Sequence, residues 1–449
     1  MFKKILIANR GEIAVRIIRA CREMDIQTVA VYSEGDKDAL HTQMADECVC
    51  IGPSPSKDSY LNENNILSAT ILKGAEAIHP GFGFLSENNR FAKMCEECNI
   101  KFIGPTSDNI SNMGNKSRAR QLMEEAKVPV VPGSKGIVTS EEDALLIAKE
   151  IGYPVMIKAS SGGGGKGIRI VNNENQLISD FNAAKREAKV SFNDDSMYIE
   201  KFVEKPRHIE IQLIADSYGN TVYLGERECS IQRKNQKVLE EAPSVILDEN
   251  MRKKMGEAAV KAAKSIGYVN AGTIEFLVDK NLNFYFMEMN TRIQVEHPVT
   301  EMVTGIDLIK EQIKVAYGEK LSFSQEDINI TGHSIECRIN AEDPYKNFMP
   351  CPGLITNLYV PGGNGIRLDS AVYQGYKIPH TYDSMIGKLI VHGKDRKEAI
   401  SKMKRALGEF IIEGVSTNID LQLSILSNDN FINGNFDTSF LETYLKSNK

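Results

Sequence analysis

The sequence predicts an α/β protein, of α+β type overall, in which an open parallel α/β domain is followed by a larger region built on charged strands. The first observation is that apolar, β-prone runs alternate with helical runs up to about Gly114, which is typical of βαβ units. The second is that three later segments alternate apolar residues with acids, bases and amides, as in strands with one polar face. With 449 residues, the chain is long enough for two to four domains.

The first domain is expected to form an open sheet. Its extended runs are KKILIA (3–8), QTVAVYS (27–33), ECVCIG (47–52) and AEAIHPGFGFLSE (75–87). Helical runs follow the first of these and lie near 62–73, and this alternation implies parallel strands. The turn after the first run, NRGE, has one glycine where a dinucleotide site needs GxGxxG, so we do not expect such a site here.

A glycine-rich loop marks the next region. Residues 115–130 look helical, and a smaller unit then contains PVMIKA, which ends in Lys158, the loop Ser160–Gly167, and the extended run IRIV. The loop is not a P-loop, because Lys166 is followed by glycine instead of Ser or Thr. Its backbone N–H groups could still wrap phosphates. The alternative is a flexible turn in solvent.

The most informative stretch is FYFMEMNTRIQVE, Phe284 to Glu296. In extended chain, one face would carry Glu288, Asn290, Arg292, Gln294 and Glu296. The ordinary interpretation is a half-buried strand with a wet face, but this set of side chains is what a metal and an anion require. Eight residues of straight strand would hold the two end carboxylates about 26 Å apart. We therefore expect a bend just after Asn290.

Two further strands show the same pattern. HIEIQL places His208, Glu210 and Gln212 on one face, and IECRIN does the same with Glu336, Arg338 and Asn340. The run GTIEFLVD (272–279) is expected to form a hairpin with NFYFME. One register of that hairpin brings Glu275 next to Glu288, and a divalent cation, Mg²⁺ for preference, would relieve their repulsion, with Asn290 as a third oxygen ligand.

Composition narrows the class of protein. Lys and Arg number 54 against 60 Asp and Glu, a net charge of −6, which does not suggest nucleic acid or an anionic membrane as a partner. No apolar run approaches the roughly 20 residues of a membrane span, and the N-terminus lacks the apolar core of a signal peptide. We expect a cytoplasmic protein.

Six strings in this order resemble the biotin carboxylase family of ATP-grasp enzymes. They are IANRGEIA, HPGFGFLSEN, KASSGGGGKG, SIQRKNQK, EMNTRIQVEHPVTE and ECRINAEDP. The resemblance covers essentially the whole chain. It implies an N-terminal domain over 1–114, a two-part ATP-grasp region over 115–317 with a mobile lid at about 131–204, and a β-rich C-terminal domain over 318–449 that completes the active site.

The resemblance also implies roles for individual residues. ATP phosphates would be held by Lys116, Lys158, Gly164 and Gly165, and adenine by the hinge Glu200, Lys201, Phe202 and Val203. Further nucleotide contacts would come from His208, Gln232 and Asn235, and Mg²⁺ (or Mn²⁺) would bind Glu275, Glu288 and Asn290. Bicarbonate would be held by Lys237, Arg292, Gln294 and Val295, with Glu296 as base and Arg338 facing biotin. At two positions the chain departs from some members: Asn235 stands where they carry His, and Phe82 where they carry Tyr.

The implied activity is ATP- and Mg²⁺-dependent carboxylation of biotin by bicarbonate through carboxyphosphate, the first half-reaction of acetyl-CoA carboxylase in fatty acid synthesis. The implied partners are a biotin carboxyl carrier protein and carboxyltransferase subunits, and the implied assembly is a homodimer. Because the chain contains no Met-Lys-Met, the attachment motif of biotin carriers, we expect the biotin on another polypeptide.

Three alternatives stay open. The chain could serve a carboxylase of the pyruvate or propionyl-CoA type. It could be another ATP-grasp ligase that joins an acid to an amine through an acyl phosphate. It could also be a regulatory nucleotide-binding protein without turnover, although such a protein would be expected to have lost a metal carboxylate or a lysine.

Overall fold

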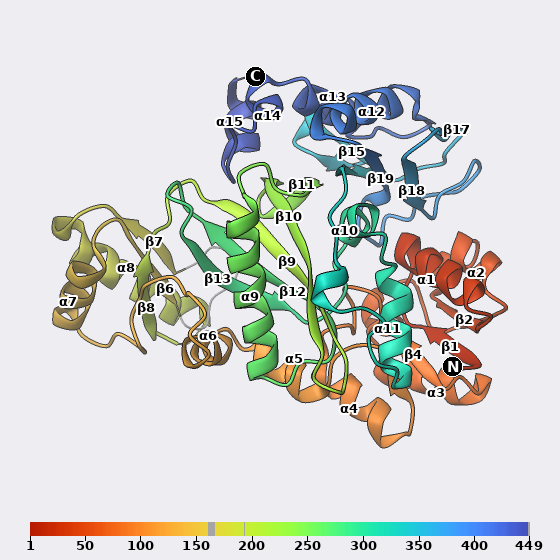
Figure 1. Cartoon of the computed structure of the whole chain (residues 1–449), viewed down its shortest axis with the longest axis horizontal. Helices are drawn as coiled ribbons and strands as arrows, with labels where there is room; N and C mark the ends of the chain where they lie inside the picture. Colours follow the sequence, from red (N-terminus) through yellow and green to blue (C-terminus); the bar gives the residue numbers. More distant parts are fainter. Residues whose placement is uncertain (160–166, 193, 448–449) are drawn as a thin grey trace. The chain divides into compact units, whose positions relative to one another are not determined.

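The computed structural model describes residues 1–159, 167–192 and 194–447, in two compact units (Figure 1). Unit 1 comprises Met1–Val128, Arg207–Phe276 and Glu288–Lys449, and unit 2 comprises Pro129–Pro206 and Leu277–Met287. Each is described by itself. No helix among the described residues combines the length and the apolar character that crossing a membrane requires.

The N-terminal part of unit 1 is the predicted open parallel sheet, with strand order β3-β2-β1-β4-β5. Its strands are β1 Lys4–Ile7, β2 Gln27–Tyr32, β3 Glu47–Cys50, β4 Ala77–His79 and β5 Lys101–Phe102. Its helices are α1 Gly11–Glu23, α2 Leu40–Met44, α3 Glu63–Lys73, α4 Asn89–Glu97 and α5 Ser107–Gly114. The apolar face of α1, with Ile13 and Ile17, is buried, as expected for an amphipathic helix that covers a sheet.

The three polar-faced strands meet in one eight-stranded sheet, in the order β13-β12-β9-β10-β11-β14-β19-β18. Its strands are β9 Arg207–Ala215, β10 Thr221–Arg233, β11 Gln236–Ala242, β12 Asn270–Val278, β13 Phe284–Asn290, β14 His333–Asn340, β18 Ile366–Ser370 and β19 Met385–Gly393. The pairings from β9 through β18 are antiparallel. One face of this sheet is therefore charged, as the strand patterns predicted.

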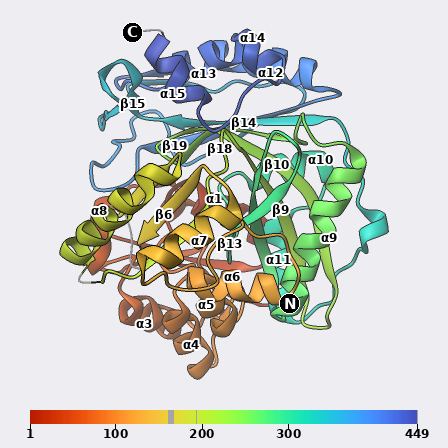
Figure 2. The same cartoon turned by 90° about the vertical axis from the view of Figure 1, so that its left-hand side faces the viewer.

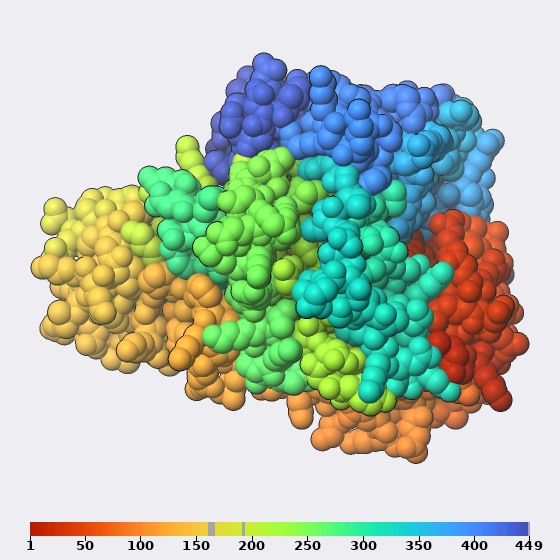
Figure 3. Space-filling view, in the orientation of Figure 1, coloured from red at the N-terminus to blue at the C-terminus, as the bar shows by residue number. Residues whose placement is uncertain are grey.

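Helices cover this sheet. Helix α9 (Glu249–Ser265) packs on β9 and β10, and α12 (Arg396–Glu409) packs on β14 and β19 (Figures 1 and 2). The other helices of this region are α6 Lys116–Glu125, α10 His297–Thr304, α11 Leu308–Tyr317, α13 Ile419–Leu426, α14 Asp429–Ile432 and α15 Phe440–Ser447. The short strands are β15 Glu342–Asp343, β16 Met349–Pro350, β17 Asn357–Tyr359 and β20 Ile411–Glu413. Figure 3 shows the C-terminal residues, in blue, gathered on one side of unit 1.

The predicted helix over 115–130 is shorter than expected. It ends at Glu125, because Lys127 adopts a left-handed conformation with φ of 55° and Val128 N–H turns back to the carbonyl of Met123. Pro129 follows and cannot continue a helix.

Unit 2 is a three-stranded antiparallel sheet, β7-β6-β8, packed against two helices. Its elements are α7 Glu141–Ile151, β6 Val155–Ala159, β7 Ile168–Val171, α8 Glu174–Phe192 and β8 Met197–Lys201. Val155, Ile157, Phe181 and Ile199 are buried in its core. Of the predicted glycine loop, residues 160–166, including Gly164 and Gly165, lie outside the described residues.

Candidate active site

The chain bends where the sequence predicted, directly after Asn290. Strand β13 ends there, residues 291–296 turn, and α10 begins at His297. Glu87, from the N-terminal sheet region, holds the turn: it accepts a hydrogen bond from the backbone N–H of Thr291 (3.0 Å) and from Nε of Arg292 (2.9 Å). Because the strand stops here, the polar side chains that follow fold back toward those before the turn.

Lys237 joins the charged strands. Its ammonium donates to Glu296 (2.6 Å), Glu210 (2.6 Å) and Glu275 (2.8 Å), from three different segments of unit 1. Burial alone would lower the pKa of Lys237, but the carboxylates outweigh it and raise that pKa well above its ordinary value. The ammonium is therefore a fixed positive charge beside Glu296.

Glu296 is fully buried, and its pKa lies well below the ordinary value. Burial acts in the opposite direction, but the cations of Lys237 and Arg338 outweigh it. Arg338 donates from Nη2 to Glu296 (2.9 Å) and from Nε to Glu240 (2.6 Å). Glu296 is thus an ionised carboxylate held between two cations.

Arg292 is fixed by the side chains on both sides of the bend. Besides its contact with Glu87, it donates to the amide oxygens of Gln294 (2.8 Å) and Asn290 (3.0 Å). Those amides in turn donate to Oε1 of Glu275, at 3.1 Å and 3.0 Å. Val295 contributes its backbone, whose carbonyl accepts a hydrogen bond from the buried Lys388 (2.8 Å).

The predicted metal ligands offer oxygen atoms that suit Mg²⁺. Burial and the nearby charge of Glu275 raise the pKa of Glu288. The ionised form of Glu288 is therefore destabilised by its surroundings. The pKa of Glu275 is lowered, because the charges of Lys237 and of the nearby His208 outweigh its burial. Two carboxylates and the Asn290 amide oxygen are the hard donors that Mg²⁺ takes. The residues present therefore fit the ion.

The predicted nucleotide contacts are divided between the two units. In unit 1, Lys116 is the first residue of α6, and its Nζ lies 3.8 Å from Glu288. His208 lies 3.0 Å from Glu275 and 3.5 Å from the amide of Gln232. Asn235 has a left-handed φ of 65° in the turn between β10 and β11.

In unit 2, Lys158 forms an ion pair with Glu200 across neighbouring strands. The ammonium of Lys201 donates to the carbonyls of Gly152 (3.0 Å) and Tyr153 (2.9 Å), and Phe202 N–H donates to Pro154 (3.0 Å). Val203 follows the end of β8. The hinge is thus anchored within unit 2 through Lys201 and Phe202.

Comparison with known proteins identifies the family. Residues 1–110 match the biotin carboxylase N-terminal domain, 115–324 the ATP-binding domain of the carbamoyl-phosphate synthase L chain, and 336–443 the biotin carboxylase C-terminal domain. The chain is 62% identical to "Biotin carboxylase 1" of Bacillus subtilis, over 99% of both chains. The chain belongs to the biotin carboxylase family.

Members of this family are ATP-dependent ligases, and the chain is one of them. It is also 54% identical to the "2-oxoglutarate carboxylase small subunit" of Hydrogenobacter thermophilus, over 99% of this chain and 94% of the relative. Its fold matches the biotin carboxylase domain dimer of 2-oxoglutarate carboxylase from the same organism, which was solved with MgADP, ADP and bicarbonate. The TM-score is 0.90, and the sequences are 53% identical over 99% of this chain and 98% of the other.

Sequence reasoning missed several residues of this biotin carboxylase site. Glu210 was noted on the polar face of HIEIQL but given no role, and Glu87 lies near the end of one of the family strings without having been assigned. Arg227 is fully buried and donates from Nε to Glu210 (2.5 Å) and from Nη1 to Gln212 (2.7 Å). Glu240 had no sequence signal, because its partner Arg338 lies on another strand.

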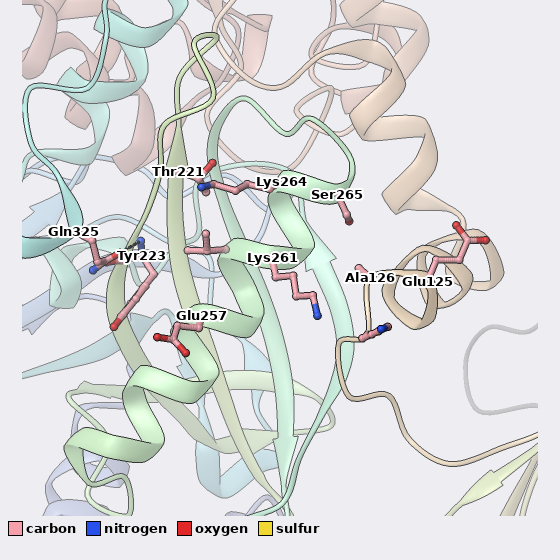
Figure 4. A pocket seen from close by; sticks show the side chains of 11 residues that line it. Glu125, Ala126, Thr221, Tyr223, Glu257, Lys261, Lys264, Ser265 and Gln325 are labelled. Atoms are coloured by element: carbon pink, nitrogen blue, oxygen red, sulfur yellow. Dashed lines mark hydrogen bonds between the residues drawn. The ribbon is translucent and has the colours of Figure 1, made fainter.

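A cavity of unit 1 lies away from the charged site. It measures about 810 Å³ and is lined by the outer side of α9, the end of α6 and part of β10. Figure 4 shows Lys261 and Ser265 of α9 turned toward Ala126 at the end of α6. No residue of this cavity belongs to the charged site. A much smaller cavity, of about 20 Å³, adjoins Arg338 and is lined also by Arg233, Lys237 and Phe348.

Proposed function

We propose that this protein carboxylates biotin with ATP and bicarbonate, and that the residues named above have the roles that the family resemblance implies. The observation that carries the proposal is the bend after Asn290. It puts Glu296 in direct contact with Lys237 and links Arg292 and Gln294 to Lys237 through Glu275. Two cations, an amide and an ionised carboxylate at one place suit a small anion that must lose a proton.

Bicarbonate binds between Lys237 and Arg292, with Gln294 and the backbone of Val295 completing its contacts. Glu296 then takes its proton. The low pKa of Glu296 opposes this step as long as Lys237 and Arg338 face the carboxylate. An incoming anion that shares the cation of Lys237 raises the pKa of Glu296, so the base becomes effective when the substrate is in place.

The deprotonated bicarbonate attacks the γ-phosphorus of ATP, the bond to the β–γ bridging oxygen breaks, and carboxyphosphate and ADP form. Lys116, Lys158 and the loop at Gly164 and Gly165 hold the phosphates and offset the charge on the transferred group. His208, Gln232, Asn235 and the hinge from Glu200 to Val203 hold the rest of the nucleotide. Mg²⁺, bound by Glu275, Glu288 and Asn290, supplies further positive charge at the phosphoryl oxygens.

Carboxyphosphate decomposes to CO₂ and phosphate, and the phosphate removes the proton of the biotin ureido nitrogen. Arg338 stabilises the negative charge that then develops on the ureido oxygen. Water would destroy carboxyphosphate, so we propose that the segment 131–204 closes over the nucleotide as a lid.

The setting of the reaction is proposed from relatives. A solved "biotin carboxylase subunit of pyruvate carboxylase" and the relative named "2-oxoglutarate carboxylase small subunit" support a catalytic polypeptide that serves a biotinylated carrier and a carboxyltransferase on other chains. We propose the acetyl-CoA carboxylase of fatty acid synthesis as the parent enzyme and the cytoplasm as its location. Relatives named simply biotin carboxylase support the first half-reaction of such an enzyme. The dimeric neighbour supports a homodimer.

The test is ATP hydrolysis by the purified protein with bicarbonate, Mg²⁺ and free biotin. We expect hydrolysis that depends on bicarbonate, rises with biotin and yields carboxybiotin. Hydrolysis that needs an amine and a different acid would instead identify another ATP-grasp ligase. To distinguish the acetyl-CoA and pyruvate types, a carrier that this protein has carboxylated is offered to each carboxyltransferase, and the proposal requires transfer to acetyl-CoA.

A further inference from the structure

Two buried glutamates lie directly opposite each other beneath Arg338. Glu240 on β11 pairs with Glu336 on β14 in the antiparallel register, and both side chains have no solvent exposure. Opposite residues of an antiparallel pair share one face of the sheet, with their Cβ atoms about 4.5–5.5 Å apart. Two carboxylates in such a position repel each other, and burial strengthens the repulsion.

Three of their four oxygens have no donor. Within the described residues, neither oxygen of Glu336 accepts a hydrogen bond, and neither does Oε2 of Glu240. Only Oε1 of Glu240 is satisfied, by Nε of Arg338 at 2.6 Å. A buried carboxylate without donors is unstable, whereas a carboxylic acid supplies a donor of its own.

A second cation on this part of the sheet, Lys388, does not neutralise Glu336. Lys388 lies diagonally from it, beside Arg338 in the register of β14 and β19. Its ammonium already lies 3.1 Å from Glu12 and donates to the carbonyl of Val295 at 2.8 Å. In accordance with this, burial raises the pKa of Glu336 well above its usual value and that of Glu240 to about 7.

We propose that Glu336 is a neutral carboxylic acid that donates a hydrogen bond to Glu240, and that this pair positions Arg338 for biotin. Glu240 then receives hydrogen bonds from both neighbours and presents a single negative charge to the guanidinium. When Glu296 takes a proton from bicarbonate, its hold on Nη2 of Arg338 weakens, and Glu240 keeps the guanidinium in place. The inference rests on the proposed function, since it assumes that Arg338 faces biotin.

Substitutions distinguish a neutral acid from a carboxylate. Glu336→Gln keeps a neutral group that can donate to Glu240, whereas Glu336→Leu leaves Glu240 without that donor. We expect kcat/KM for biotin to fall at least tenfold in Glu336→Leu, and Glu336→Gln to recover most of that loss. Glu240→Gln removes the charge under Arg338, and we expect its kcat/KM for biotin to fall at least tenfold, with a smaller fall in the bicarbonate-dependent ATPase measured without biotin.

Infrared spectroscopy tests the proton directly. The difference spectrum between the unmodified protein and Glu336→Gln is expected to contain the carbonyl stretch of a protonated carboxylic acid at neutral pH. Glu413→Gln, the same change at an exposed strand position, is expected to give no such band and unchanged activity.

Two results would overturn the inference: no acid band in the difference spectrum, or Glu336→Gln as impaired as Glu336→Leu. A Glu240→Gln variant with an unchanged kcat/KM for biotin would likewise show that the pair does not position Arg338. If the unmodified protein itself fails to carboxylate biotin, the proposed function is wrong, and the infrared band then reports on the acid pair alone.

Discussion

Glu296 faces two conflicting requirements, because the cations that place it also reduce its basicity. Lys237 and Arg338 keep this buried carboxylate ionised, and in doing so they hold its pKa well below the ordinary value. A base of that kind works only when the substrate competes for one of those cations. Substitutions of single charged residues therefore test which of these side chains each substrate requires.

The first prediction concerns the two metal carboxylates. Glu288→Gln is expected to abolish ATP turnover while the protein stays folded, because removing one of two neighbouring carboxylates relieves the repulsion that raises the pKa of Glu288. The measurements are ATPase activity over a range of Mg²⁺ concentrations and thermal unfolding without Mg²⁺. An active variant with unchanged Mg²⁺ dependence would contradict the metal assignment.

The second prediction separates the proposed role of Glu296 as base from the proposed role of Arg338 as biotin contact. Arg338→Ala is expected to lose biotin carboxylation far more than the bicarbonate-dependent ATPase, because only the biotin step needs its guanidinium. Glu296→Ala is expected to lose both, since no carboxyphosphate forms without the base. Both activities are measured on both variants, and identical patterns of loss would show that the roles are not separate.

At the scale of elements, the decisive feature is the turn that Glu87 holds between β13 and α10. Its carboxylate orients Arg292 from the segment between β4 and α4, so the proposed bicarbonate site depends on the packing of the N-terminal region. The strand patterns and the bend could be predicted from the sequence, because alternation and length are local properties. The partners Glu87 and Glu240 could not, because they depend on which strands and loops meet in three dimensions.

The third prediction tests this turn. Glu87→Ala removes charge-assisted hydrogen bonds to Thr291 and Arg292, and we expect the KM for bicarbonate to rise about tenfold, which corresponds to about 1.4 kcal/mol for a contact that is partly exposed. Glu97→Ala, at an exposed position of α4, is the matched control. A KM for bicarbonate equal to that of the control would remove Glu87 from the site.

The fourth prediction concerns the proposed lid. If the segment 131–204 closes over ATP, amide hydrogen exchange in β6, β7 and the loop between them should slow when a non-hydrolysable ATP analogue binds. Strand β1 of the N-terminal sheet serves as the internal reference. Equal exchange in the lid segment with and without the analogue would argue against closure.

At the scale of the whole molecule, buried histidines link stability to pH. His41 is fully buried, and burial lowers its pKa from 6.5 to about 4. Between these values the unfolded chain binds a proton that the folded protein does not, so this contribution to stability is present above pH 6.5 and is lost as the pH falls toward 4.

The fifth prediction follows from that sign. The free energy of unfolding, measured by urea titration, should fall between pH 7 and pH 5 by a larger amount in the unmodified protein than in His41→Gln. Glutamine keeps a donor for the carbonyl of Val31, which His41 contacts at 3.2 Å, but does not titrate. The same pH slope in both proteins would show that His41 is protonated in the folded state.

The buried ion pair of Arg227 and Glu210 limits how this enzyme can be made more thermostable. Replacing a buried ion pair by apolar residues of similar volume is often neutral or stabilising by about 1–4 kcal/mol. A design procedure that rewards stability alone would therefore select that exchange, and would remove the carboxylate that holds Lys237 beside Glu296. Sequence design on this scaffold should keep the charged sheet face fixed and vary exposed apolar positions such as Ile71 and Leu72 of α3.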